Sequence, residues 1–148
     1  MPHHSGLGGH SDGDVLLHAI TDALLGAIAA PDIGALFPPS DPKWKGADSV
    51  VFLREALKRA RDKGYGVSNI DASLILAAPK IGPHTATIRA RVAELLGVPG
   101  DCVGLKAKTP EGLDLDNAAM AHVAVLLEKT TATKKIGKKP ASKKKRRS

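Results

Sequence analysis

The stretch GHSDGDVLLHAITDALLG, residues 9–26, decides the first element of the fold. Its aliphatic residues recur every three or four positions and cover most of a helix circumference: Val15, Leu16, Leu17, Ile20, Ala23, Leu24, Leu25 and, just beyond, Ala27 and Ile28. We predict a largely buried helix that ends near residue 29 and is capped by Ser11 or Asp12. Asp14, His18 and Asp22 follow one another at intervals of four, so they line one narrow polar strip.

Working outward, the chain alternates loop, helix and strand patterns. Residues 31–48 hold four prolines and two glycines, and a loop of this length in a compact domain usually binds or covers a ligand. Helical spacing predicts helices over 49–63 and from Pro83 to about 96, and alternation predicts strands over 67–77 and 103–107. Residues 119–128 fit either a helix or a strand, and we interpret them as a strand. The order predicts an α/β fold of two layers, with helices on one face of a small mixed sheet.

Composition excludes several classes of protein. The 148 residues are 43% hydrophobic, enough for one aliphatic core, and only 3% are aromatic, too few for a platform that stacks several bases. A single cysteine excludes an internal disulfide. No apolar run reaches the roughly 18 residues of a membrane span, and no basic, then apolar leader precedes residue 9. We therefore expect a soluble protein of the cytoplasm.

The positive charge lies at the end of the chain. Residues 129–148 hold eight lysines, two arginines and no acid, whereas residues 1–128 hold 12 bases and all 15 acids. The last twenty residues have one large aliphatic side chain, Ile136, so they are predicted to be a disordered basic tail that follows a domain of residues 1–128. Such a tail favours weak contact with nucleic acid or another polyanion.

Four ordered blocks over residues 9–113 resemble the 2-C-methyl-D-erythritol 2,4-cyclodiphosphate synthase family. They are the stretch quoted above; DIG at 32–34 with LFP at 36–38, DP at 41–42 and KGADS at 45–49; APK at 78–80 with PH at 83–84; and KA-x-T-x-E at 106–111. The resemblance implies an enzyme that cyclises 4-diphosphocytidyl-2-C-methyl-D-erythritol 2-phosphate and releases CMP. It also implies a zinc ion, a second ion that is Mg²⁺ or Mn²⁺, and a homotrimer with active sites between subunits.

The resemblance assigns roles to individual residues. His18 matches a zinc ligand, Glu111 matches the carboxylate at the second metal, and His10 and Thr109 match the catalytic pair that steadies the transition state. The positions that match contacts around the erythritol phosphate are Ser11, Asp32, Ile33, Gly34, Phe37 and Asp41. Those that match the cytidine diphosphate pocket, contributed by a neighbouring subunit, are Leu76, Ala78, Pro79, Lys80, Ile81, Gly82, Ala107 and Lys108.

Taken alone, several of these residues have simpler interpretations. His18 is then a hydrogen-bonded core histidine, Asp14 and Asp22 are helix-surface acids or partners that orient the imidazole, and Glu111 is a surface residue of a turn. Asp32 and Asp41 are common turn formers.

The chain also departs from the family. Its members normally begin with a strand ending in Asp-x-His, which supplies two more zinc ligands, and no segment before His18 matches it. We therefore expect an N-terminally shortened domain with an incomplete zinc site. After Leu113, a shorter DLDN replaces the family's Gly-Arg-Gly-Glu segment. Two alternatives stay open: a trimeric homologue without activity, and a polyanion binder that uses the basic tail.

Overall fold

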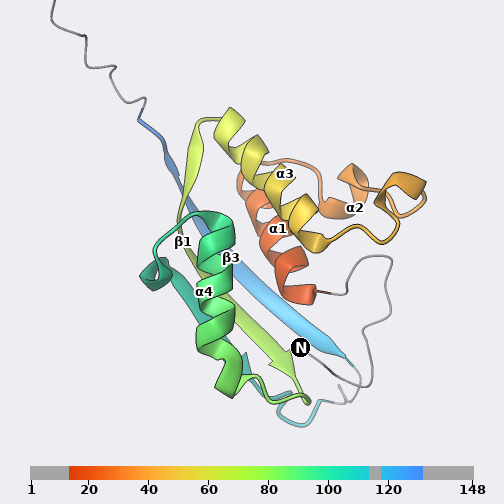
Figure 1. Ribbon diagram of the computed structural model, residues 1–148, viewed down its shortest axis with the longest axis vertical. Coiled ribbons are helices and arrows are strands. Elements are labelled where there is room, and N and C mark those ends of the chain that lie inside the picture. The colour runs from red at the N-terminus through yellow and green to blue at the C-terminus, as the bar shows by residue number, and fades with distance from the viewer. Residues whose placement is uncertain (1–13, 114–117, 132–148) are drawn as a thin grey trace, which may run out of the picture.

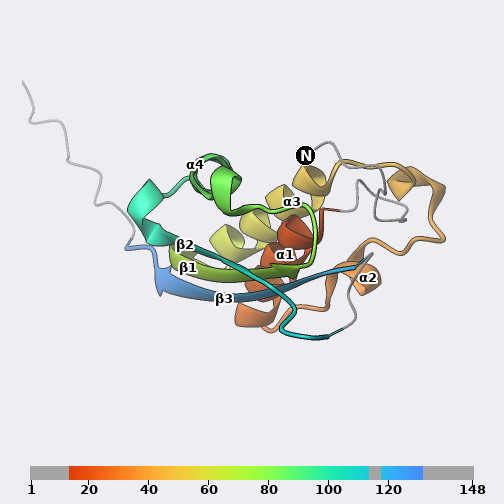
Figure 2. The same cartoon turned by 90° about the horizontal axis from the view of Figure 1, so that it is seen from below.

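A mixed three-stranded sheet forms one layer of the protein, and helices form the other (Figures 1 and 2). The computed structural model describes residues 14–113 and 118–131. Its elements are α1 (Val15–Ala27), α2 (Ile33–Leu36), α3 (Ser49–Asp62), β1 (Tyr65–Leu76), α4 (Thr85–Leu96), β2 (Val103–Lys108) and β3 (Ala119–Lys129), with 3₁₀ turns at Pro42–Trp44, Gly82–His84 and Gly100–Cys102. The predicted two-layer fold is confirmed, and so is the interpretation of residues 119–128 as a strand.

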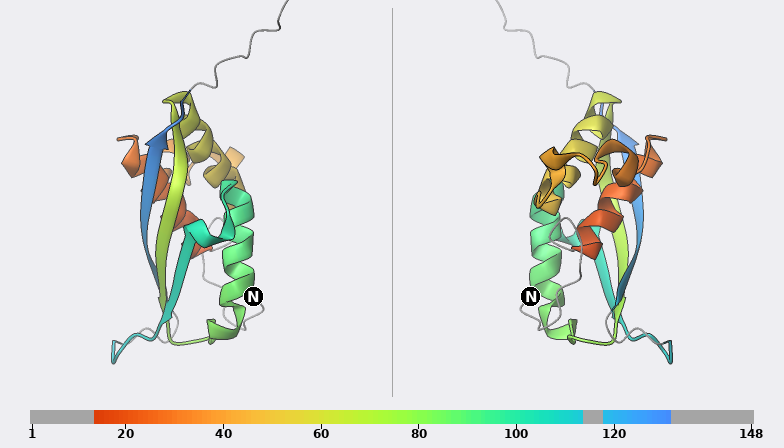
Figure 3. Two further views of the ribbon diagram at one scale, coloured as in Figure 1. Left: turned by 90° about the vertical axis from the view of Figure 1, so that its left-hand side faces the viewer. Right: turned by 90° about the vertical axis from the view of Figure 1, so that its right-hand side faces the viewer.

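The sheet has the order β2-β1-β3. β1 and β2 run parallel and are joined through α4, whereas β1 and β3 run antiparallel with a register shift between Val67 and Asn69. Seen edge-on in Figure 3, α3 and α4 lie on one side of the strands. α1 contacts both α3 and β3. Because one face of the sheet is covered, the inward side chains of β1 are buried: Ile70, Ala72 and Leu74.

The start of α1 differs from the prediction. Asp14, not Ser11 or Asp12, is the N-cap, and its Oδ1 accepts a hydrogen bond from Leu17 N at 3.0 Å. Ser11, Asp12 and Asp14 lie close together in sequence. Only the residue directly before the helix, Asp14, can reach the amide of the third helical residue, Leu17. The buried face of α1 follows the predicted stripe: Leu16, Leu17, Ile20, Thr21, Leu24 and Leu25.

The long loop after α1 is more ordered than its composition predicts. Asp32 caps the four residues of α2, because its Oδ1 accepts from Ala35 N at 2.8 Å. Asp41 caps the turn Pro42–Trp44 in the same way, accepting from Lys43 N at 2.9 Å. The loop is therefore a chain of short capped turns, which gives its side chains defined positions.

The outer face of the sheet carries both apolar and polar side chains. Met120 and Leu126 of β3 are 39% and 59% exposed. Beside them on β1 and β2, Asp71 pairs with Lys106 at 2.6 Å. Within residues 14–113 and 118–131, every helix is too short or too polar to cross a lipid bilayer.

Candidate functional site

A pocket of about 210 Å³ opens between α1, α3 and the long loop. His18 lines it from α1 and Phe52 from α3, and the loop supplies the rest of the wall: Ile33, Gly34, Phe37, Pro39 and Trp44. The predicted substrate residues Ile33, Gly34 and Phe37 thus lie together on one pocket. The expectation that this loop forms a binding segment agrees with its position.

Three aromatic rings form the apolar wall of the pocket. The ring centroid of Phe37 lies 4.8 Å from that of Phe52 and 5.0 Å from that of Trp44, with the Trp44 contact edge-on. Trp44 and Phe52 are 5.9 Å apart, and Lys43 Nζ lies 4.4 Å from the Trp44 ring. Such contacts hold rings in fixed orientations. Sequence reasoning missed Trp44, Phe52 and Pro39. Because the chain has few aromatic residues, the presence of Phe37 and Trp44 in one loop could have indicated that this loop lines a pocket.

His18 is held by a residue that the sequence analysis did not single out. Its Nε2 lies 3.1 Å from the hydroxyl of Ser49, which is only 1% exposed. Ser49 is the first residue of α3, and Asp48 before it caps that helix by accepting from Val50 N at 2.8 Å. The Phe52 ring packs on the imidazole with centroids 6.2 Å apart. The half-buried imidazole is therefore oriented at the pocket by the start of α3.

The acids that flank His18 on the polar strip contact backbone amides. Asp14 caps α1, and Asp22 Oδ1 accepts from Ile33 N at 2.8 Å. This second bond ties the middle of α1 to the start of α2. Asp22 therefore positions the loop that forms the pocket wall, a role that neither sequence interpretation of this residue included.

A second group of predicted residues lies at the carboxyl ends of β1 and β2. Because these strands are parallel neighbours, with Leu74 opposite Ala107, the segments that follow them leave the same edge of the sheet. This places together the predicted nucleotide residues: Leu76, Ala78, Pro79, Lys80, Ile81, Gly82, Ala107 and Lys108. Ile81 is buried, while Lys80 and Lys108 are exposed and can meet phosphate charge.

Thr109 and Glu111 stand beside this second group. Thr109 Oγ1 donates to Glu111 Oε1 at 2.5 Å. Glu111 has φ 49°, a left-handed conformation that is uncommon for a residue with a side chain and that clusters at functional sites.

The described side chains do not form a metal site on their own. Nowhere among residues 14–113 and 118–131 do three His, Cys, Asp or Glu side chains gather in a group that could hold a metal ion. A catalytic zinc takes three protein ligands, so the described residues do not fit the ion by themselves. His10 and Ser11 lie outside the described residues.

Comparison with known proteins finds similar proteins both by sequence and by fold. A model of the YgbB family matches residues 1–128. The chain is 67% identical over 129 residues to a 2-C-methyl-D-erythritol 2,4-cyclodiphosphate synthase of Koribacter versatilis, covering 87% of this chain and 83% of that protein. It is 53% identical to the chloroplastic synthase of Oryza sativa, covering 86% of this chain and 59% of the rice protein. A solved structure of such a synthase in a CDP-bound form superposes with a TM-score of 0.78 at 43% identity, covering 82% of this chain and 80% of that one.

Proposed function

The chain belongs to the YgbB family, and from this membership we propose that it acts as a 2-C-methyl-D-erythritol 2,4-cyclodiphosphate synthase. It would convert 4-diphosphocytidyl-2-C-methyl-D-erythritol 2-phosphate to the cyclic diphosphate and release CMP. The observation that carries the proposal is the 67% identity over 129 residues to a protein of that name. An oriented imidazole beside a pocket supports it.

The two groups of residues suit the two halves of this substrate. The pocket at His18 offers aromatic rings and Ile33 to a branched carbon skeleton, and the edge of the sheet offers Lys80 and Lys108 to a nucleotide diphosphate. From the family resemblance, we propose that the nucleotide group of one subunit serves the pocket of its neighbour in a homotrimer. The exposed Met120 and Leu126 on the open sheet face support burial of that face between subunits.

The reaction must bring two anionic phosphates together. Lysine side chains at the sheet edge lower the Coulomb repulsion, and fixed orientation of both groups lowers the entropy cost of the attack. Two divalent cations, zinc and either Mg²⁺ or Mn²⁺, are part of the proposal and would polarise the phosphates. The residues that the structure describes do not complete a site for zinc by themselves.

Release of CMP from the diphosphocytidyl substrate tests the proposal directly. Phosphorus NMR of the full chain with Zn²⁺ and Mg²⁺ should show the cyclic product and CMP in equal amounts. His18→Gln should abolish turnover, whereas His84→Gln, which alters an exposed histidine outside both groups, should not. Metal analysis of the purified protein checks the cofactors separately.

Absence of turnover in the folded, metal-supplemented protein would contradict the proposal. That result would favour the trimeric homologue without activity.

A cytoplasmic location is proposed with the function, since both substrate and product are charged small molecules.

A further inference from the structure

Lys43 and Trp44 are neighbours in the long loop, at a point to which the family resemblance assigns no role. The resemblance covers DP at 41–42 and resumes with KGADS at 45–49. Trp44 nevertheless lines the pocket at His18, whereas Lys43 is exposed and does not line it. Lys43 Nζ lies 4.4 Å from the centroid of the Trp44 ring. An ammonium is attracted to an aromatic ring over distances up to about 6 Å from the centroid.

A short capped turn fixes the backbone of this pair. Asp41 Oδ1 accepts a hydrogen bond from Lys43 N at 2.9 Å, and Asp41 O accepts one from Trp44 N at 3.1 Å. After the turn, Trp44 O accepts from Ala47 N at 3.1 Å. Both side chains therefore start from a fixed backbone, and the orientation of the ring depends on the contacts of its side chain.

Trp44 is the least buried of the three rings in the pocket wall. It is half-buried, whereas Phe37 and Phe52 are 9% and 5% exposed and belong to the core. The Trp44 ring meets Phe37 edge-on with centroids 5.0 Å apart, and it lies 5.9 Å from Phe52. Because one side of the indole is open, each remaining contact matters for its rotamer. The ammonium of Lys43 is one of these contacts.

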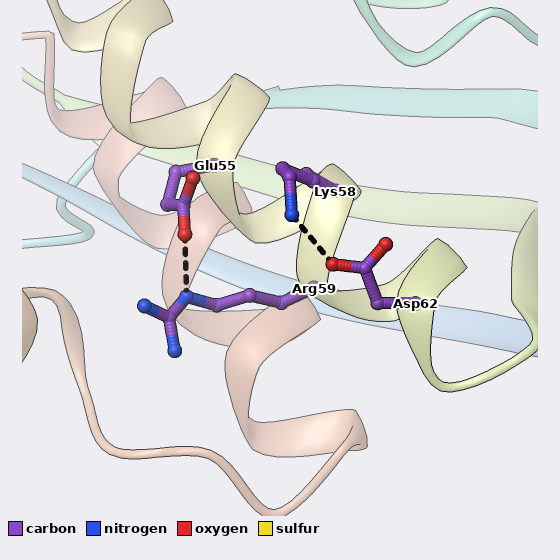
Figure 4. Close-up of polar contacts among 4 residues, drawn as sticks. All are labelled: Glu55, Lys58, Arg59 and Asp62. Carbon is purple, nitrogen blue, oxygen red and sulfur yellow. Dashed lines mark hydrogen bonds and ion pairs between the residues drawn. The ribbon is translucent and has the colours of Figure 1, made fainter.

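Lys43 differs from a lysine of the neighbouring helix that has an acidic partner. Lys58 on α3 pairs with Asp62 at 2.6 Å (Figure 4), and the hydrogen bond and charge of Asp62 raise the pKa of Lys58. In the part of the chain that the structure describes, no carboxylate forms an ion pair with Lys43. The Trp44 ring is therefore the group that holds this ammonium.

We propose that Lys43 is a positioning residue of the pocket. It holds the Trp44 ring in the orientation that forms the wall for the carbon skeleton of the substrate. The inference rests on the proposed function, because the ligand of that reaction is what meets the wall. Lys43 acts through the ring and takes no part in the chemical step.

The size of the effect follows from the strength of the contact. A cation–ring contact at an exposed site changes an equilibrium constant about two- to fivefold at 25 °C. Without the ammonium, the fraction of molecules whose ring forms the wall falls by at most this factor, and the apparent dissociation constant rises accordingly. The reacting groups are the same once the ligand is bound, so kcat should not change.

Trp44 is the only tryptophan of the chain, so indole fluorescence reports on this ring alone. The full chain with Zn²⁺ and Mg²⁺ is titrated with the cyclic diphosphate product, which cannot react in the absence of CMP. The dissociation constant of Lys43→Gln should be about two- to fivefold higher than that of the wild type, and KM should rise equally at constant kcat. Lys43→Arg should restore both values, because a guanidinium also stacks on an aromatic ring.

Two further measurements separate the ring contact from a general effect of charge. Acrylamide should quench Trp44 more strongly in Lys43→Gln than in the wild type, because the ring is less restrained. Lys58→Gln removes an exposed positive charge on α3 and no contact of the wall, so it should match the wild type in quenching, binding and kinetics.

Three results would overturn the inference while the proposed function stands. One is a dissociation constant that is equal in the wild type and Lys43→Gln. Another is failure of Lys43→Arg to restore binding, which would mean that the charge does not hold the ring. The third is a wild-type protein that releases CMP but whose Trp44 fluorescence does not respond to the product. A protein that neither binds the product nor releases CMP would contradict the proposed function, and the inference with it.

Discussion

Glu111 adopts a backbone conformation that glycine reaches at lower energy. Its φ is 49°, that of Gly112 is 87°, and Leu113 N donates to Pro110 O at 3.0 Å, so both central residues of this turn are left-handed, as in type I′ turns. A left-handed residue with a Cβ costs about 1–2 kcal/mol, and glycine loses about 0.5–1 kcal/mol more entropy on folding. Glycine at position 111 should therefore be more stable than alanine by about 1 kcal/mol.

The comparison of Glu111→Gly with Glu111→Ala isolates this backbone term. Both variants lose the carboxylate and the hydrogen bond from Thr109, so only the left-handed strain differs between them. Urea denaturation should show the difference of about 1 kcal/mol, equivalent to roughly 4 °C in Tm. Both variants should also lose CMP release, because the family resemblance assigns the Glu111 carboxylate to the second metal ion.

Either measurement can refute the reasoning. If the glycine variant is no more stable than the alanine variant, the left-handed conformation is not strained in solution. If it releases CMP at the wild-type rate, the carboxylate has no part in the reaction, and the turn alone explains the conformation.

Three further predictions concern the pocket and the open sheet face. Ser49→Ala should lower kcat about 10-fold, because the imidazole of His18 loses its orienting partner; an unchanged kcat in steady-state kinetics would contradict this role. Trp44→Leu removes an edge-on contact to Phe37 worth about 1 kcal/mol, so KM should rise about fivefold in steady-state kinetics, and an unchanged KM would show that this wall does not bind substrate. Leu126→Lys should leave circular dichroism intact but convert the proposed trimer to monomers by light scattering, whereas a persistent trimer would place the interface elsewhere.

Local patterns predicted most of the fold because they depend on residues close together in sequence. The stripe on α1 and the alternation in β3 each follow from periods of three to four and of two. The N-cap of α1 was missed for a different reason. Ser11, Asp12 and Asp14 are all good caps by residue type, and only the backbone decides that Asp14 reaches Leu17 N.

The pocket was harder to predict because its contacts cross long sequence distances. His18 stood out as a polar residue on an apolar helix, but its partner Ser49 is 31 residues away and lies within another element. The position of Asp22 near the start of α2 likewise depends on how the loop returns to α1. Periodicity says nothing about such pairs. The roles of Thr109 and Glu111 came from the family resemblance alone.

Thr130, just after β3, donates two hydrogen bonds to the carbonyl of Gly64, from its amide at 2.9 Å and from its hydroxyl at 3.1 Å, and this contact has a mechanical consequence. A force applied at Thr131 pulls along the axis of β3, whose ladder to β1 runs from Lys129 opposite Tyr65 to Ala119 opposite Leu76. The ladder hydrogen bonds lie perpendicular to the strands, so a load between Thr131 and the end of β1 at Leu76 shears them together instead of breaking them one by one. A load between these two points can therefore be resisted without losing the β1–β3 pairing.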